Sequence, residues 1–181
     1  MKREEALELL RKNLKHKNLI KHSLAVEACM RALAEKLGED PERWGLAGLL
    51  HDIDYEKTMD APEKHGLLAM EILKGKVEDQ EILHAIRAHA WKEEPKTKMA
   101  WALYSSDPLT GLIVAAALMH PTRTLAGVDL RFLKKRFKEK RFAAGADREQ
   151  IKKCEKIGLE LDRFMEICLQ AMKGISGELG L

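Results

Sequence analysis

The chain has 181 residues, which at roughly 100–200 residues per domain is room for one domain with a core of its own. Hydrophobic residues make up 45% and charged residues 34%, a composition that disfavours a disordered chain. The 32 Lys and Arg residues nearly balance the 29 Asp and Glu residues, so the net charge of +3 does not by itself indicate a nucleic-acid partner.

The apolar runs and the cysteines predict a cytoplasmic protein without a membrane partner. The run Leu112–Met119 has eight residues, against the roughly 20 that cross a bilayer. The N-terminal sequence MKREEALELLRK is charged and lacks the apolar stretch of a signal peptide. The three cysteines form no CxxC pair, which favours reduced thiols.

Helical periodicity dominates the chain and predicts an all-α fold. Gly38 is a suitable C-cap for one helix, and Asp40 followed by Pro41 is typical of the start of the next. That next helix contains WGLAGLLHDI, which is apolar almost all round and should therefore be buried. A loop is expected at about 54–62, and fraying after 174. The expected helices lie around residues 7–14, at about 18–37, from 41 through the apolar stretch, and at about 63–74, 79–91, 97–106, 107–119 and 148–172.

Histidines and aspartates fall on the apolar faces of these helices. His22 lies at helical spacing from Leu19 and Val26, so it should point inward with them. His84 falls on a more polar, solvent-facing side of its helix than His89 does. The polar side chains expected to point inward are His22, His51, Asp52, His65, His89 and Asp107.

These inward polar groups predict a metal site. A buried carboxylate without a partner is costly, and a buried imidazole needs hydrogen-bond partners. One such histidine alone is more often an ordinary core residue, but the whole set needs a common partner. A divalent cation serves them all, because imidazoles supply nitrogen and carboxylates supply oxygen and charge. The mixed set suits Mn, Fe, Co, Ni, Zn or Mg better than a thiolate-bound structural zinc.

The ordered pattern of these residues resembles the HD-domain superfamily of metal-dependent phosphohydrolases, whose members carry H…HD…D on a helical bundle. Here the pattern is formed by His22, His51-Asp52 and Asp107, and the resemblance spans about residues 18–120. Within the superfamily the chain looks like the small stand-alone HD or HDIG-type proteins. The surrounding sequences that carry the resemblance are HDIDYEK, KHG, AIRAHA and SSDPLTGLIVAAAL.

The resemblance implies an HD-domain helical bundle, a domain layout and a ligand set. It implies one HD domain over 1–181, with a motif-bearing core at about 18–120, a helical extension at about 121–172 and a frayed tail at 174–181. The four residues of the motif would hold a first ion. In members with two ions, His65 and His89 match the additional ligands, with Asp52 bridging. The alternative role of these two histidines is phosphate contact beside a single ion, and His84 is a substitute for His89.

The expected activity is hydrolysis of a small phosphate ester, a nucleotide being one candidate, by attack of metal-bound water. Asp52 would hold or deprotonate this water. Whether the enzyme is a phosphomonoesterase or a phosphodiesterase stays open. Lys57, five residues after the motif pair, is a catalytic and phosphate-binding candidate, against a solvated loop lysine. Thr110 and Arg123 are candidates for substrate binding. Asp54 and Glu56 are nearby acid–base candidates, although surface carboxylates are common.

Two further features are open to more than one interpretation. The segment RFLKKRFKEKR at 131–141 holds seven Lys and Arg residues and is typical of an amphipathic helix with a solvated basic face. Its alternative role is a basic rim that attracts nucleotide or nucleic acid. Three aromatic residues lie near the site helices: Trp91, Trp101 and Tyr104. Their helical spacing favours a role in the core over stacking on a base.

Three alternative functions stay open at this point. The same ligand set serves a di-iron oxygenase in some HD-fold proteins. A non-catalytic nucleotide sensor would keep the site without turnover. Nucleic-acid binding through 131–141 would leave the metal as a structural element, but the even charge balance does not favour a nucleic-acid partner. The expected partner is a small phosphorylated substrate. The exact substrate, the metal and its number, and homo-oligomer formation are left open by the sequence.

Overall fold

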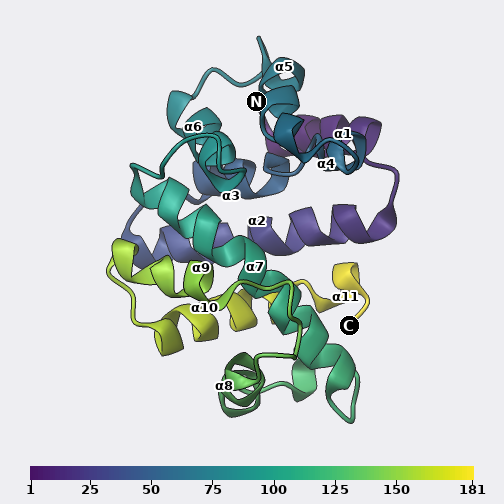
Figure 1. Cartoon of the computed structure of the whole chain (residues 1–181), viewed down its shortest axis with the longest axis vertical. Helices are drawn as coiled ribbons and strands as arrows, with labels where there is room; N and C mark the ends of the chain where they lie inside the picture. Colours follow the sequence, from purple (N-terminus) through teal and green to yellow (C-terminus); the bar gives the residue numbers. More distant parts are fainter.

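The computed structural model describes all 181 residues and contains helices but no strand, which confirms the all-α prediction (Figure 1). Short 3-10 helices lie at Pro62–Lys64, Leu125–Gly127 and Lys153–Ile157. The α-helices are α1 (Arg3–Asn13), α2 (Lys17–Leu37), α3 (Pro41–Leu50), α4 (Tyr55–Thr58), α5 (Leu67–Leu73), α6 (Gln80–His89), α7 (Lys98–Met119), α8 (Leu130–Lys138), α9 (Arg148–Lys152), α10 (Leu161–Gly174) and α11 (Ser176–Leu179).

The packing of α2 on α3 brings the first half of the motif together. Gly38 ends α2 in a left-handed conformation, and the Asp40 carboxylate accepts hydrogen bonds from two N–H groups of the first turn of α3. The two helices approach closely at Gly48, where an added Cβ would lie 2.9 Å from the backbone of Glu27. Glycine is therefore required at this crossing, and the C-terminal end of α3 with His51 is held against α2.

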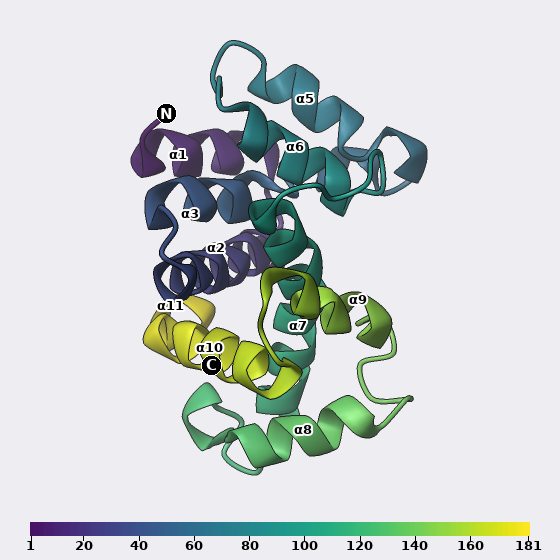
Figure 2. The same cartoon turned by 90° about the vertical axis from the view of Figure 1, so that its left-hand side faces the viewer.

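The long helix α7 runs through the middle of the molecule and packs against α2, α6 and α9 (Figure 2). The sequence predicted two helices that meet at Asp107, but the helix is continuous from Lys98 to Met119. Pro108 has no N–H to donate to the Tyr104 carbonyl one turn earlier, and the Gln150 side chain donates to that carbonyl instead, at 2.8 Å. By length and composition α7 could span a membrane, but 61% of its most apolar window is buried within the fold.

The C-terminal part of the chain also differs from the expected pattern. Instead of one helix at 148–172 there are two α-helices separated by Gly158, which is in the left-handed conformation. The residues expected to fray include α11, which packs on α2 and buries Leu179. The amphipathic helix expected at 131–141 is present as α8, with Leu133 and Phe137 buried. One apolar cluster of 47 buried residues runs from Ala6 to Leu179, so both parts of the chain share a core.

Candidate metal centre

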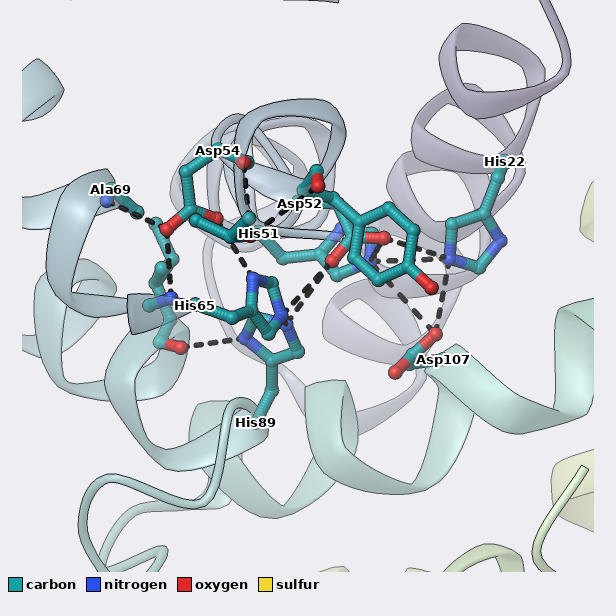
Figure 3. A network of polar contacts seen from close by, with 12 residues as sticks. His22, His51, Asp52, Asp54, His65, Ala69, His89 and Asp107 are labelled. Atoms are coloured by element: carbon teal, nitrogen blue, oxygen red, sulfur yellow. Dashed lines mark hydrogen bonds and ion pairs between the residues drawn. The ribbon is translucent and has the colours of Figure 1, made fainter. Parts of the chain in front are cut away.

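The six polar side chains expected to point inward converge at one place in the fold (Figure 3). They come from five separate segments of the chain. His51, Asp52 and His89 are buried, with exposed fractions of 0%, 8% and 4%. The full set comprises His22 on α2, His51 and Asp52 at the end of α3, His65 before α5, His89 at the end of α6, and Asp107 within α7.

The first group of ligand atoms gathers around the Nε2 atom of His22. This atom lies 3.0 Å from Asp107 Oδ1 and 3.2 Å from His51 Nε2. Asp52 Oδ2 lies 3.6 Å from His22 Nε2 and 3.4 Å from His51 Nε2. All four residues of the motif therefore direct a ligand atom toward one small volume.

The second group uses the other oxygen of the same aspartate. Asp52 Oδ1 lies 3.4 Å from Nε2 of His65 and 3.4 Å from Nε2 of His89. These two nitrogens are 3.2 Å apart. Asp52 thus turns one carboxylate oxygen to each group, which is the arrangement of a bridging ligand.

Backbone carbonyls fix the tautomers of two of the histidines. His51 Nδ1 lies 2.7 Å from the Gly48 carbonyl oxygen, and His89 Nδ1 lies 2.6 Å from the Ile86 carbonyl oxygen. A carbonyl can only accept, so each Nδ1 carries a proton and donates it. When these imidazoles are neutral, each Nε2 offers a lone pair to the centre of the site.

Side chains play the same part for the other two histidines. His65 Nδ1 donates to Asp54 Oδ1 at 2.9 Å. His22 Nδ1 lies 3.2 Å from Thr110 Oγ1, whose own proton goes to the Asp107 carbonyl at 2.8 Å, so His22 is the donor. The neutral form of all four histidines therefore directs an Nε2 lone pair inward.

This arrangement fits a divalent cation. While both imidazoles of such a pair are neutral, the two lone pairs that face each other at 3.2 Å repel, and neither ring can donate a hydrogen bond to the other. A positive charge between nitrogen and carboxylate ligands removes the repulsion. No thiol belongs to the set, because the three cysteines lie buried elsewhere in the core. The donor set is thus that of a metal site with nitrogen and oxygen ligands.

The charges of the site also favour a cation. Burial by itself would raise the pKa of Asp52, but His51, His89 and His22 outweigh it and hold that pKa well below its usual range. Burial would likewise lower the pKa of His51, but Asp52 and Asp107 raise it to about 9. In the metal-free protein, a proton on His51 thus supplies positive charge where a bound cation would supply it, and the two compete.

A pocket of about 360 Å³ opens from the centre toward solvent. Every member of the ligand set except His51 contributes to its wall. The remaining lining residues are Leu19, Tyr55, Ala90, Trp91 and Gln150. This volume lies within the range of small-molecule sites, which is roughly 300–1,000 Å³.

The structure does not bring the other predicted site residues into this pocket. Lys57 is exposed and donates through Nζ to Asn13 Oδ1 at 2.7 Å. Arg123 is exposed in the turn after α7, which itself continues for about three helical turns beyond Asp107. Thr110 is buried and positions His22, and it lines a neighbouring groove rather than the pocket. The geometry therefore gives no support to a direct substrate contact by Lys57 or Arg123.

The sequence did not reveal that Asp54 supports the site from within the core. It is fully buried, not a surface carboxylate. Its Oδ2 accepts from the Gly66 and Ala69 N–H groups at 2.8 and 2.9 Å, and its Oδ1 accepts from His65. The partners lie 11 to 15 residues further along the chain, so local periodicity held no sign of this role.

His84, the alternative candidate to His89, does not join the ligand set and instead pairs with Glu93 at 3.0 Å. Glu56 accepts from the backbone of Lys15 and His16.

Comparison with known proteins identifies curated relatives that match part of this chain. Ribonuclease Y of Nitratidesulfovibrio vulgaris is 36% identical over 94 residues, and that of Oleidesulfovibrio alaskensis is 34% identical over 94 residues. Each match covers 52% of this chain and 18% of the relative. Ribonuclease Y of Lawsonia intracellularis is 35% identical over 102 residues, which is 56% of this chain and 20% of that protein. The chain thus spans about a fifth of the length of these relatives.

No solved structure gives a significant match. The family model of the HD domain matches residues 19–118, which is more than half of the chain and includes all six converging side chains. The resemblance found in the sequence is therefore confirmed, and this chain belongs to the HD domain family.

Proposed function

We propose that this protein is a metal-dependent phosphohydrolase that acts on a small phosphate ester, a nucleotide being the leading candidate. Membership of the HD domain family supports hydrolysis as the reaction class. The observation that carries the proposal is the placement of Asp52, whose two oxygens face two separate groups of imidazole Nε2 atoms. This donor set, at the base of an open pocket, meets the requirements of a hydrolytic metal site.

Each residue of the site has a distinct task in this proposal. His22, His51, Asp52 and Asp107 would hold one ion, and His65 and His89 would hold a second that Asp52 shares. A divalent ion bound there neutralises phosphate charge and lowers the pKa of water. Gly48, Ile86, Asp54 and Thr110 keep the imidazoles in the tautomer that binds metal. Asp52 lies between the two groups, where its carboxylate can orient the attacking water.

Metal analysis followed by an activity panel tests the proposal. The purified chain is assayed by mass spectrometry for Mn, Fe, Co, Ni, Zn and Mg, and then with nucleotides and simple phosphate mono- and diesters. We expect hydrolysis by the wild type and a loss of at least a hundredfold in Asp52→Ala. The matched control is Asp60→Ala, an exposed aspartate outside the pocket, which should retain full activity. Unchanged activity in Asp52→Ala would refute the assignment.

The same measurements separate the two non-hydrolytic alternatives. Two iron ions with a visible or EPR spectrum, and no hydrolysis, would favour an oxygenase. Tight nucleotide binding without product across the metal series would favour a sensor. Both outcomes contradict the hydrolase proposal while leaving the metal site intact.

RNA is a second candidate substrate, because relatives of this chain are named ribonuclease Y. The names of the relatives thus weigh against the sequence-based expectation that did not favour a nucleic-acid partner. The basic side of α8 supplies an electrostatic surface for RNA, where Arg131, Lys134, Lys135 and Lys138 line a shallow depression. A charge reversal at Lys135, which is exposed, should weaken binding of single-stranded RNA and reduce its salt dependence, while hydrolysis of a mononucleotide should not change. The matched reversal at exposed Lys152 should leave both unchanged.

A further inference from the structure

Trp91 occupies an unusual position at the mouth of the pocket. The side chain is 69% exposed, and it lines the same pocket as Asp52, His89 and Asp107. It follows His89 by two residues, directly after α6 ends. A large apolar ring is therefore exposed to solvent at the entrance to the candidate metal centre. A ligand that covered this ring would gain the free energy of burying its apolar surface.

The backbone of Trp91 has a strained conformation that two hydrogen bonds hold in place. Its φ angle is +59°, in the left-handed region that side chains other than those of Gly, Asn and Asp rarely adopt. The Trp91 N–H donates to the Ala88 carbonyl and the Lys92 N–H to the Arg87 carbonyl, each at 3.1 Å. The turn thus fixes the backbone from which the indole projects. Strained residues of this kind concentrate at functional sites.

The indole packs against one neighbouring aromatic side chain. The ring of Trp91 packs against Tyr104 with a centroid distance of 5.0 Å and an interplanar angle of 70°. Tyr104 lies one turn before Asp107 on α7, so this aromatic pair is fixed to the same helix as a ligand of the metal centre. Gln150 also lines the pocket and is held by its hydrogen bond to the Tyr104 carbonyl. The edge contact with Tyr104 and the high exposure leave a broad surface of the indole uncovered.

We propose that Trp91 is the stacking platform for a nucleobase whose attached phosphate enters the metal centre. The platform binds the base through its flat apolar face, so it accepts purines more strongly than it accepts a sugar or an alkyl group. The position of the phosphate rests on the proposed function, whereas the recognition of the base does not. A free nucleotide and the end of an RNA strand present the same ring, and the experiment below separates them.

Calorimetric titration with adenosine tests the platform without any hydrolysable bond. The wild type should bind adenosine and should not bind ribose. Trp91→Ala should weaken adenosine binding about five- to a hundredfold, and Trp91→Phe should restore most of it because a flat ring is retained. The matched control is Met59→Ala, which removes another exposed apolar side chain, 61% exposed and outside the pocket, and should bind like the wild type. Far-UV circular dichroism and a melting curve check that each variant is folded.

A second arm separates the platform from the proposed chemistry. With added Mn²⁺, Trp91→Ala should raise KM for adenosine monophosphate and leave KM for glycerol 2-phosphate unchanged. If neither ester is hydrolysed but adenosine binding still depends on Trp91, the hydrolase proposal fails and the platform stands. If adenosine does not bind but a short RNA does, and Trp91→Ala weakens it, the platform serves RNA. Wild-type affinity in Trp91→Ala for both, or no binding of either by the wild type, overturns the inference.

Discussion

The buried carboxylate of Asp54 accepts a hydrogen bond from His65 Nδ1 at 2.9 Å through one oxygen. Its other oxygen accepts from the N–H groups of Gly66 and Ala69 at the start of α5. The aspartate therefore sets both the tautomer of His65 and the position of the segment that carries it. A ligand supported in this way depends on its partner, because the partner orients the imidazole and raises its basicity.

We expect Asp54→Asn to weaken metal binding in the second group about 10- to 100-fold. The amide keeps the volume of the side chain but cannot accept all three hydrogen bonds as well as a carboxylate does. Metal-to-protein ratios measured across a metal titration should show the loss of one ion while the other is retained. Asp60→Asn, at an exposed position, is the control. Full retention of both ions in Asp54→Asn would contradict the positioning role.

Gly48→Ala should destabilise the protein by roughly 1–3 kcal/mol through overpacking. An added Cβ would lie 2.9 Å from backbone atoms of α2, and backbone cannot move aside as a flexible side chain can. The displacement would also move the carbonyl that fixes His51. The control is Gly111→Ala on α7, where an added Cβ meets nothing within 4 Å and should stabilise by roughly 0.5–1 kcal/mol. Urea unfolding gives both values, and equal signs for the two variants would contradict this explanation.

Removal of metal should lower the stability of the wild type. A ligand that binds only the folded state stabilises it by about 2.7 kcal/mol at a free concentration of 100 times Kd. A chelator should thus lower the melting temperature, and added Mn²⁺ should restore it. The melting temperature of Asp52→Ala should change little with metal, since this variant lacks the shared ligand. A wild-type melting temperature that ignores both chelator and metal would exclude a functional ion at this site.

Acid should weaken the link between α3 and α6. Arg43 donates to both oxygens of Asp79, at 2.7 and 3.1 Å, and this pairing lowers the pKa of Asp79. Asp79 also caps α6 by accepting from the Glu81 N–H at 3.0 Å. Because its pKa is lower in the folded state, its contribution is complete above the unfolded value of about 3.9 and is lost as pH falls below it.

The difference in unfolding free energy between wild type and Asp79→Asn isolates that contribution. We expect about 1 kcal/mol at pH 6, shrinking toward pH 3, since asparagine still caps α6 and the variant loses only a partly exposed ion pair. A difference that is constant between pH 3 and pH 6 would show that the charge of Asp79 has no part in the stability.

The residues that could be predicted from the sequence are those whose role follows from helical spacing. His22 and His89 lie on apolar rows, so their inward direction was readable, and the buried end of α3 was marked by the apolar run before His51. Helix boundaries at Gly38 and Asp40 followed from capping chemistry.

The missed features depend on partners that are distant in the sequence. A new helix was expected to begin at Asp107, because nothing near Pro108 shows that Gln150 donates to the carbonyl that proline leaves without a partner. Asp54 was taken for a surface residue for the same reason. Lys57 was close in sequence to the motif pair, but α4 turns its side chain toward Asn13. Trp91 was expected in the core, since spacing alone does not reveal a left-handed turn.

Gln150 has a consequence for how this protein can be shortened. It lies on α9, outside the segment 19–118 that the family model matches, yet it both replaces the hydrogen bond that Pro108 interrupts and lines the pocket beside the candidate metal centre. A fragment limited to residues 19–118 would keep all six side chains proposed to bind metal. It would lack Gln150, and the pocket would therefore be incomplete on that side. The segment that carries α9 is thus a structural component of the pocket, which any minimal version of the protein must retain.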